Sequence, residues 1–279
     1  MTVPGRREPA VAGRFYPAGA AALAWTVLSE VDAVAVPGDE PPAPAYVVPH
    51  AGYRYSGPTA ARVYARLRAH AGTVRRVLLI GPAHHVPLRG AAVPTVACWG
   101  TPLGDVRIDL AGARALAAAG HAVADDAPLA PEHSLEVQLP FLQRCLPATV
   151  PVLPVVIGQS TVESTVALLV AAGAGDSGTV LLCSTDLSHY LTHQAALATD
   201  RDTLAAVAAL APQRIGVRDA CGVFALRGLL GWARLRELRP RLLHHCTSGD
   251  RTGDLDRVVG YAALALDAAP AAGAADRPG

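Results

Sequence analysis

The sequence predicts a three-layer α/β/α fold, in which helices cover both faces of a mixed, mainly parallel central sheet. Short apolar runs bounded by glycine, proline and polar residues alternate along the chain with longer segments of helical periodicity. The composition is 51% hydrophobic but only 5% aromatic, so Ala, Val and Leu must fill the interior, which suits helices packed on a sheet. A chain of 279 residues is long for one domain and short for two, and we expect one core.

Each element follows from a local pattern. The apolar runs predict strands at Ala45–Val48, Val74–Ile80, Ala91–Ala97, Val150–Ile157, Thr179–Ser184 and Val258–Leu266. The periodic segments predict helices near Ala20–Val31, Gly57–His70, Leu110–Ala119, Ser134–Leu146, Val162–Ala172, His193–Leu210 and Ala220–Leu235. The helix after Ser134 is the best marked, because its leucines fall on one face, and Pro140 should kink it. We expect a loop at Val36–Pro44, one α/β domain over residues 1–266 and a disordered tail over residues 267–279.

Composition and motif content exclude several classes of function. The formal charge is +1, from 24 basic and 23 acidic residues, so we expect neither nucleic acid nor an anionic membrane as a partner. The five cysteines are odd in number and widely spaced, which favours reduced thiols and a cytoplasmic protein, and no signal peptide is recognisable. The sequence contains no phosphate-binding glycine motif, no Gly-x-Ser-x-Gly elbow and no His-Glu-x-x-His pair.

Three predicted strands are each followed by histidine. His50 follows Ala45–Val48, His84 follows Val74–Ile80, and Asp186 and His189 follow Thr179–Ser184. A single loop histidine is more often a surface or hydrogen-bonded residue than a ligand. In open α/β sheets, however, ligands bind beyond the carboxyl ends of the strands, where loops converge. Three strand-end histidines beside small residues therefore predict one shared site.

Three further patterns carry candidate chemistry. Cys221 lies where a helix is expected to begin, and a helix N-terminus stabilises the thiolate that binds metals, although a small buried cysteine is the plainer interpretation. His133 lies in Glu-His-Ser-Leu-Glu at 132–136, where Ser134 as a helix cap explains most of the pattern. His-His-Cys at 244–246 resembles a metal cluster by content, but adjacent strand residues point to opposite faces, so we predict no second metal site there.

A family resemblance covers nearly the whole chain in order. Pro-His-Ala-Gly-Tyr at 49–53, Gly-Pro-Ala-His-His-Val-Pro-Leu at 81–88, Thr-Pro-Leu-Gly-Asp at 101–105, Glu-His-Ser-Leu-Glu at 132–136, Ser-Thr-Asp-Leu-Ser-His at 184–189, Cys-Gly at 221–222, Thr-Ser-Gly-Asp at 247–250 and Val-Gly-Tyr at 259–261 resemble the Memo family. Bacterial and archaeal members are often called AmmeMemoRadiSam system protein B. The family is similar in fold to class III extradiol dioxygenases, which use non-haem iron and oxygen to open catechol rings.

The resemblance implies roles for the site residues. It implies that His50 and His84 are metal ligands and that Cys221 stands where the dioxygenases place a carboxylate. Asp186 and His189 match the family's remaining polar site residues, with His189 at the position of a catalytic histidine, and His133 falls in a shared motif. We therefore take His189, Asp186 and His133 as the candidate catalytic residues. A thiolate is softer than a carboxylate, so ring cleavage is not simply inherited.

The preferred hypothesis is an iron- or copper-dependent redox protein, dioxygenase-like, with zinc ranked below both metals. The family's association with a radical-SAM protein and an AMMECR-type protein implies work within a modification system, on an unknown small-molecule or peptide substrate. Two alternatives stay open. One is a non-catalytic module that binds a peptide or small anion in the same crevice, and the other is metal-assisted hydrolysis.

Overall fold

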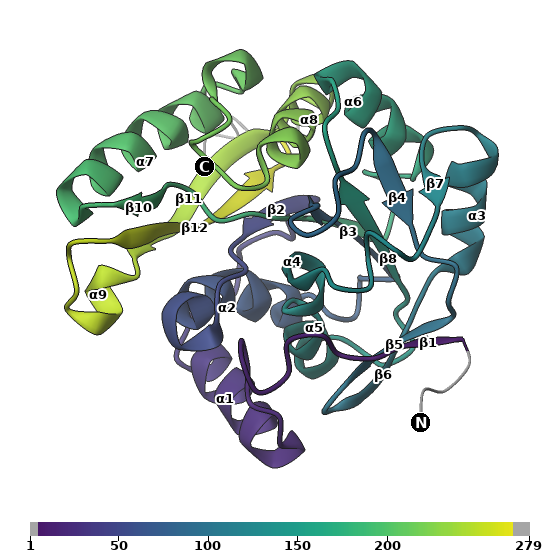
Figure 1. Ribbon diagram of the computed structural model, residues 1–279, viewed down its shortest axis with the longest axis horizontal. Helices are drawn as coiled ribbons and strands as arrows, with labels where there is room; N and C mark the ends of the chain where they lie inside the picture. The colour runs from purple at the N-terminus through teal and green to yellow at the C-terminus, as the bar shows by residue number, and fades with distance from the viewer. Residues whose placement is uncertain (1–4, 270–279) are drawn as a thin grey trace, which may run out of the picture.

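A nine-stranded mixed sheet forms the centre of the molecule (Figure 1). The computed structural model describes residues 5–269. Four parallel strands form the middle of the sheet, in the order β2 (Ala45–Val48), β9 (Thr179–Ser184), β3 (Arg76–Pro82) and β8 (Val152–Ile157). On one side, β12 (Val258–Asp267) runs antiparallel to β2 and pairs antiparallel with both β11 (Arg239–Thr247) and β10 (His189–Leu191). On the other side, β4 (Ala91–Val93) runs antiparallel to β8 and pairs in parallel with β7 (Val123–Ala124).

Helices cover both faces of this sheet, which confirms the three-layer α/β/α class (Figure 1). One face carries α1 (Ala20–Asp32), α2 (Tyr53–Ala69), α4 (His133–Glu136) and α5 (Leu139–Cys145), together with a small sheet of β1 (Arg6–Arg7), β5 (Cys98–Thr101) and β6 (Gly104–Arg107). The other face carries α3 (Leu110–Ala118), α6 (Val162–Ala171), α7 (His193–Ala208) and α8 (Val223–Leu235). The short helices η1 (Pro212–Arg214) and α9 (Gly249–Thr252) lie in connections.

The central strands are buried on both faces. Their sequences are therefore continuous apolar runs. Along β2, Tyr46 and Val48 pack into the core under α1 and α2, while Ala45 and Val47 pack into the core under α6 and α8. This alternation follows from the period-two geometry of a strand. Truncating a fully buried residue such as Leu79 to Ala should cost about 2–5 kcal/mol.

The predicted helix Ser134–Leu146 is wrong as a single kinked helix. The chain instead forms α4 and α5, separated by a short break, and Pro140 lies in the first turn of the second helix. Proline has no N–H to donate, and the first turn is the place where a helix does not need one. Ser134 of α4 bonds the Pro82 carbonyl at the end of β3 and His133 stacks on His84, while α5 keeps its leucines in the core.

The ends of several other helices and strands also differ from those predicted. The predicted strand Ala91–Ala97 ends at Val93, because Pro94 cannot donate to the ladder. The helix expected from Gly57 begins one turn earlier at Tyr53, and the helix expected from Ala220 begins at Val223. The segment Val36–Pro44 is a loop, as predicted, and β12 extends to Asp267. Residues 270–279, most of the predicted tail, lie outside the described residues.

The strand order brings three connections to one edge. Strands β2 and β3 are not neighbours, because β9 pairs with both of them in parallel. The loops that leave β2, β9 and β3 therefore emerge side by side at the carboxyl end of the sheet. Among the described residues, no helix is both long enough and apolar enough to cross a membrane.

Candidate metal centre

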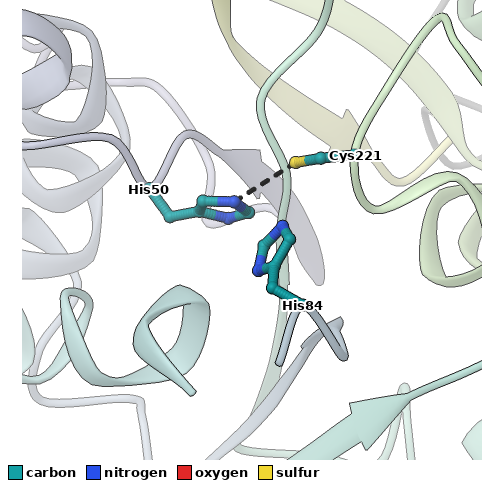
Figure 2. Close-up of side chains that lie close together, drawn as sticks. All are labelled: His50, His84 and Cys221. Carbon is teal, nitrogen blue, oxygen red and sulfur yellow. Dashed lines mark hydrogen bonds between the residues drawn. The ribbon is translucent and has the colours of Figure 1, made fainter. Parts of the chain in front are cut away.

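His50, His84 and Cys221 face one another at this edge of the sheet (Figure 2). One donor atom from each side chain lies within 4.8 Å of the donor atoms of the other two. The His50 Nε2 and the Cys221 Sγ are 3.2 Å apart. His50 is 1% exposed and forms the floor of the site, whereas the His84 side chain is 25% exposed and faces solvent. The three candidate ligands predicted from the sequence are therefore brought together.

A polar network beneath His50 fixes which ring nitrogen carries the proton. The Ser184 hydroxyl donates to the carbonyl of Ser134 at 2.6 Å and accepts from the Gln138 amide at 2.9 Å. The same amide nitrogen donates to the carbonyl of Pro49 at 2.9 Å, which sets the orientation of the amide. Only one acceptor site of the Ser184 oxygen is then left for His50 Nδ1, 3.0 Å away, so Nδ1 must be the donor. His50 Nε2 is left with its lone pair toward Cys221.

His84 is fixed in the same tautomer by a buried carboxylate. Glu132 accepts from the His84 backbone N–H at 2.6 Å and from His84 Nδ1 at 2.9 Å. This leaves the lone pair of His84 Nε2 free to bind an ion. Glu132 has no solvent exposure. Burial alone would raise the pKa of Glu132, but hydrogen bonds from His84 and Ser134 outweigh it and hold the pKa well below its ordinary range. A histidine backed by a carboxylate is the usual outer support of a metal ligand.

Cys221 lies before the helix, not within its first turn. Gly222 is the N-cap residue of α8, and its N–H donates to the Thr185 hydroxyl at 2.9 Å. The Cys221 sulfur accepts from the Asp186 N–H at 3.3 Å. Burial, followed by the charge of Asp186, raises the pKa of the Cys221 thiol. Backbone hydrogen bonds from Asp186 and from Gly222 at the helix start act in the opposite direction, but burial outweighs them. A cation at the site would offset this cost.

Asp186 and His189 border the three donors. Asp186 is 4% exposed, and one of its carboxylate oxygens accepts from the His50 backbone N–H at 2.7 Å. Burial raises the pKa of Asp186 to about 6, against the hydrogen bond from His50. His189 Nδ1 lies 2.8 Å from the Leu187 carbonyl, which can only accept, so Nδ1 is protonated and Nε2 is free. Asp186, His189 and Cys221 also form a group compatible with a metal ion.

His133 lies beside the His84 and His50 rings. Its ring stacks on His84 with centroids 4.6 Å apart and contacts Phe15 at 4.7 Å. His133 Nδ1 is 3.3 Å from His85 Nε2. Burial lowers the pKa of His133 to about 4, so the ring is neutral at pH 7. His133 therefore lines the mouth of the site beside His84, and the exposed His85 stands outside it.

Glu136 holds the N-terminal segment in place through several hydrogen bonds. Arg7, the backbone of Ala10 and Val11, and the Tyr16 hydroxyl all donate to the Glu136 carboxylate, at 2.6–3.0 Å. The prediction that Ser134 caps this helix is wrong, whereas Glu136 does lie in the first helical turn. Glu132 is the cap residue and accepts from the Ser134 N–H at 2.8 Å, while Glu136 is a buried anchor.

The histidines and cysteine of β11 lie away from this site. His244 Nδ1 and Cys246 Sγ contact the same hydroxyl, that of Thr59, at 3.0 and 3.2 Å. His245 points to the other face and bonds Asp200 at 2.9 Å. The alternation expected for adjacent strand residues is thus confirmed.

The donor set fits a transition metal. Two donors bonded at about 2.0–2.3 Å and about 90–110° apart are separated by about 3–3.6 Å, and the His50 Nε2 and Cys221 Sγ lie 3.2 Å apart. Both imidazoles present Nε2 because both Nδ1 atoms are engaged. Two imidazoles and one thiol suit borderline and soft ions such as iron, copper and zinc better than magnesium or calcium.

Glu132, Ser184 and Gln138 are supporting residues that the sequence reasoning did not single out. Glu132 was visible within its motif, but Ser134, a preferred N-cap residue type, already accounted for the motif as a helix start. Ser184 is the last residue of β9, directly before the polar loop. Gln138 lies in the break between α4 and α5, which the sequence pattern did not predict.

Comparison with known proteins gives a consistent result. The model of the family described as Memo-like protein matches residues 7–265. A MEMO1 family protein of Methanopyrus kandleri is 36% identical over 92% of this chain and 98% of its own length. MEMO1 family proteins of Caldivirga maquilingensis and Ignicoccus hospitalis are 34% and 36% identical, over 93% and 92% of this chain and 98% and 97% of their own lengths. With the family model spanning almost all of the described residues and relatives about one third identical from end to end, the chain belongs to the Memo family.

Proposed function

We propose that this chain is a metal-dependent redox protein that holds iron or copper through His50, His84 and Cys221. The convergence of the three donor atoms within 4.8 Å of one another carries the proposal. The two tautomers strengthen it, because each ring offers Nε2 without first having to lose a proton from it. A bound iron or copper ion would supply redox chemistry at the open edge of the sheet.

The remaining site residues would transfer protons or hold other groups of the site in position. His189 keeps Nδ1–H on the Leu187 carbonyl, so Nε2 is free to take a proton from a substrate and return it. Asp186 holds the His50 backbone and lies behind the sulfur of Cys221. His133 offers a neutral ring beside His84, against which a substrate would be oriented.

The cellular setting belongs to the same proposal. We further propose that the protein acts in the cytoplasm with radical-SAM and AMMECR-type partner proteins, on a small-molecule or peptide substrate. The near balance of 24 basic and 23 acidic residues supports such a partner more than nucleic acid.

Metal titration and oxygen uptake on one set of preparations test the function. Protein purified without oxygen should contain about one iron or copper ion per chain by elemental analysis. Cys221→Ser should lower metal affinity first, because a hydroxyl is a poor ligand for such ions. Cys246→Ser is the matched control, since that partly buried thiol contacts Thr59 and none of the three donors.

His189→Ala should behave differently. It should retain metal but lose about 10²–10⁴-fold of any oxygen-dependent turnover, since positioned proton transfer contributes that much. A parent protein that takes up no oxygen, and whose two variants bind metal and a peptide ligand normally, would instead support the non-catalytic binding module.

A further inference from the structure

Asp200 is a buried carboxylate on α7 with contacts that the proposed metal centre does not explain. It has no solvent exposure. One of its oxygens accepts from the Ser188 backbone N–H at 3.0 Å, and the other lies 2.9 Å from His245 Nε2. An ionised carboxylate in such a place is costly unless it is hydrogen-bonded, so these two contacts define what Asp200 does.

Gly260 on β12 leaves room for this carboxylate. A Cβ atom at Gly260 would lie 1.9 Å from the nearer Asp200 oxygen, so any other residue would displace the carboxylate. The backbone of Gly260 also exchanges two hydrogen bonds with the site loop, which we define as residues 184–189. Leu187 N–H donates to the Gly260 carbonyl at 2.8 Å, and Gly260 N–H donates to the Ser188 carbonyl at 2.9 Å. Asp200 and Gly260 therefore both hold Ser188, and Gly260 also holds Leu187.

The site loop in turn touches the residues of the metal centre. Asp186, two residues before Ser188, accepts from the His50 N–H and donates its own N–H to the Cys221 sulfur. His189, one residue after Ser188, donates to the Leu187 carbonyl. A shift of Ser188 would move both neighbours, because they are linked through rigid peptide planes. The hydrogen bond from Ser188 to Asp200 thus affects the position of the Cys221 sulfur, a candidate ligand, and of Nε2 of His189, the proposed proton carrier.

We propose that Asp200 is a positioning residue that, supported by His245 and admitted by Gly260, fixes the site loop in the geometry that the metal centre needs. This gives a function to one residue of the His-His-Cys segment that does not require it to bind metal. The consequence for the metal rests on the proposed function, whereas the consequence for the loop does not.

The first measurement uses the wild-type protein without metal. Hydrogen exchange followed by NMR should show the Ser188 amide protected on the order of 10³-fold relative to an exposed loop amide. Long-range proton–nitrogen spectra should show His189 as a single tautomer protonated at Nδ1, because its carbonyl partner can only accept. A Ser188 amide that exchanges like an exposed one would overturn the proposal.

Variants then separate the positioning role from general stability. Asp200→Ala should speed Ser188 exchange at least about tenfold and give mixed His189 tautomers. Asp200→Asn should restore both, since an amide oxygen can still accept from Ser188 while His245 changes tautomer. His244→Gln is the matched control, because that neighbour contacts Thr59 and not Asp200. Should Asp200→Ala fail to fold, Gly260→Ala, which only pushes the carboxylate aside, carries the same expectation.

Metal titration supplies the last readout. Asp200→Ala should weaken iron or copper binding about 10-fold, the lower end of what loss of a direct partner of a ligand costs, because Asp200 acts on Cys221 only through Ser188 and Asp186. Asp200→Asn should stay near wild type. Unchanged Ser188 exchange and His189 spectra in whichever of the alanine variants folds would overturn the positioning role. An unchanged metal affinity beside altered spectra would overturn the link to the ligands. A wild-type protein that binds no metal would overturn the proposed function. The Ser188 exchange rates and the His189 spectra would then decide this inference.

Discussion

Replacing Glu132 by Gln should weaken both the fold around His84 and the affinity of the site for metal. The Glu132 carboxylate accepts from the His84 N–H at 2.6 Å, from His84 Nδ1 at 2.9 Å and from the Ser134 N–H at 2.8 Å. These bonds use both carboxylate oxygens, and a Gln side chain has only one acceptor, so its NH₂ group must face a donor. Losing one hydrogen bond to a charged group costs about 1.5–3 kcal/mol. In a chain of this size that corresponds to a fall in Tm of roughly 3–12 °C.

Two assays on the same variant check this reasoning. Thermal unfolding followed by circular dichroism in the presence of a chelator gives the loss of stability, and competition with the chelator gives the metal affinity, which should fall about 10–100-fold. Glu163→Gln is the control, because that exposed carboxylate in the first turn of α6 should change stability by less than about 0.5 kcal/mol. A Glu132→Gln protein with wild-type Tm and wild-type affinity would refute the view that this carboxylate holds His84 in place.

Three more outcomes are expected. Replacing residues 244–246 together by Ala should leave the number of bound metal ions unchanged, since their contacts are Thr59 and Asp200, and a lower stoichiometry by elemental analysis would contradict this. Burial would raise the pKa of Glu40, but hydrogen bonds from two arginines outweigh it and lower that pKa. The stability Glu40 adds is therefore complete above about pH 4.3 and is lost as the pH falls through its folded pKa, so the stability gap between wild type and Glu40→Gln should close in acid and not stay constant. Burial raises the pKa of Cys145 to about 12, so its thiol should resist alkylation at pH 8 until the protein unfolds, and rapid labelling of the folded protein would count against the structure.

Much of the sheet was predictable because its strands are buried on both faces. Ala45–Val48 and Thr179–Ser184 have the predicted bounds, since each is a short apolar run that ends where polar residues begin. The apolar runs did not predict the bounds of β11, although residues 244–246 were treated as strand residues, because Arg239–Thr247 is only partly buried and carries arginines and histidines. The break between α4 and α5 was also missed, because leucines continue with helical spacing on both sides of it.

The candidate ligands were predictable for a similar reason. His50, His84 and Asp186 each follow an apolar run closely, and a parallel sheet sends the carboxyl ends of its strands to one edge. Spacing alone does not place Cys221 at this edge, since it follows no strand. Its place beside His50 depends on backbone and side-chain bonds to Thr185 and Asp186 that no local pattern encodes.

By itself the sequence determined the layers of the fold, the histidine-bearing edge and the family, because hydrophobic periodicity and contiguous motifs are local properties of a chain. Only the tertiary structure decided which nitrogen of each histidine is free, what supports it and how costly the thiolate is. Those properties depend on a Ser184 hydroxyl and a Glu132 carboxylate that are 134 and 48 residues away from the rings they hold. Protonation and tautomer are set by partners in space and by burial, and neither is encoded by spacing along the chain.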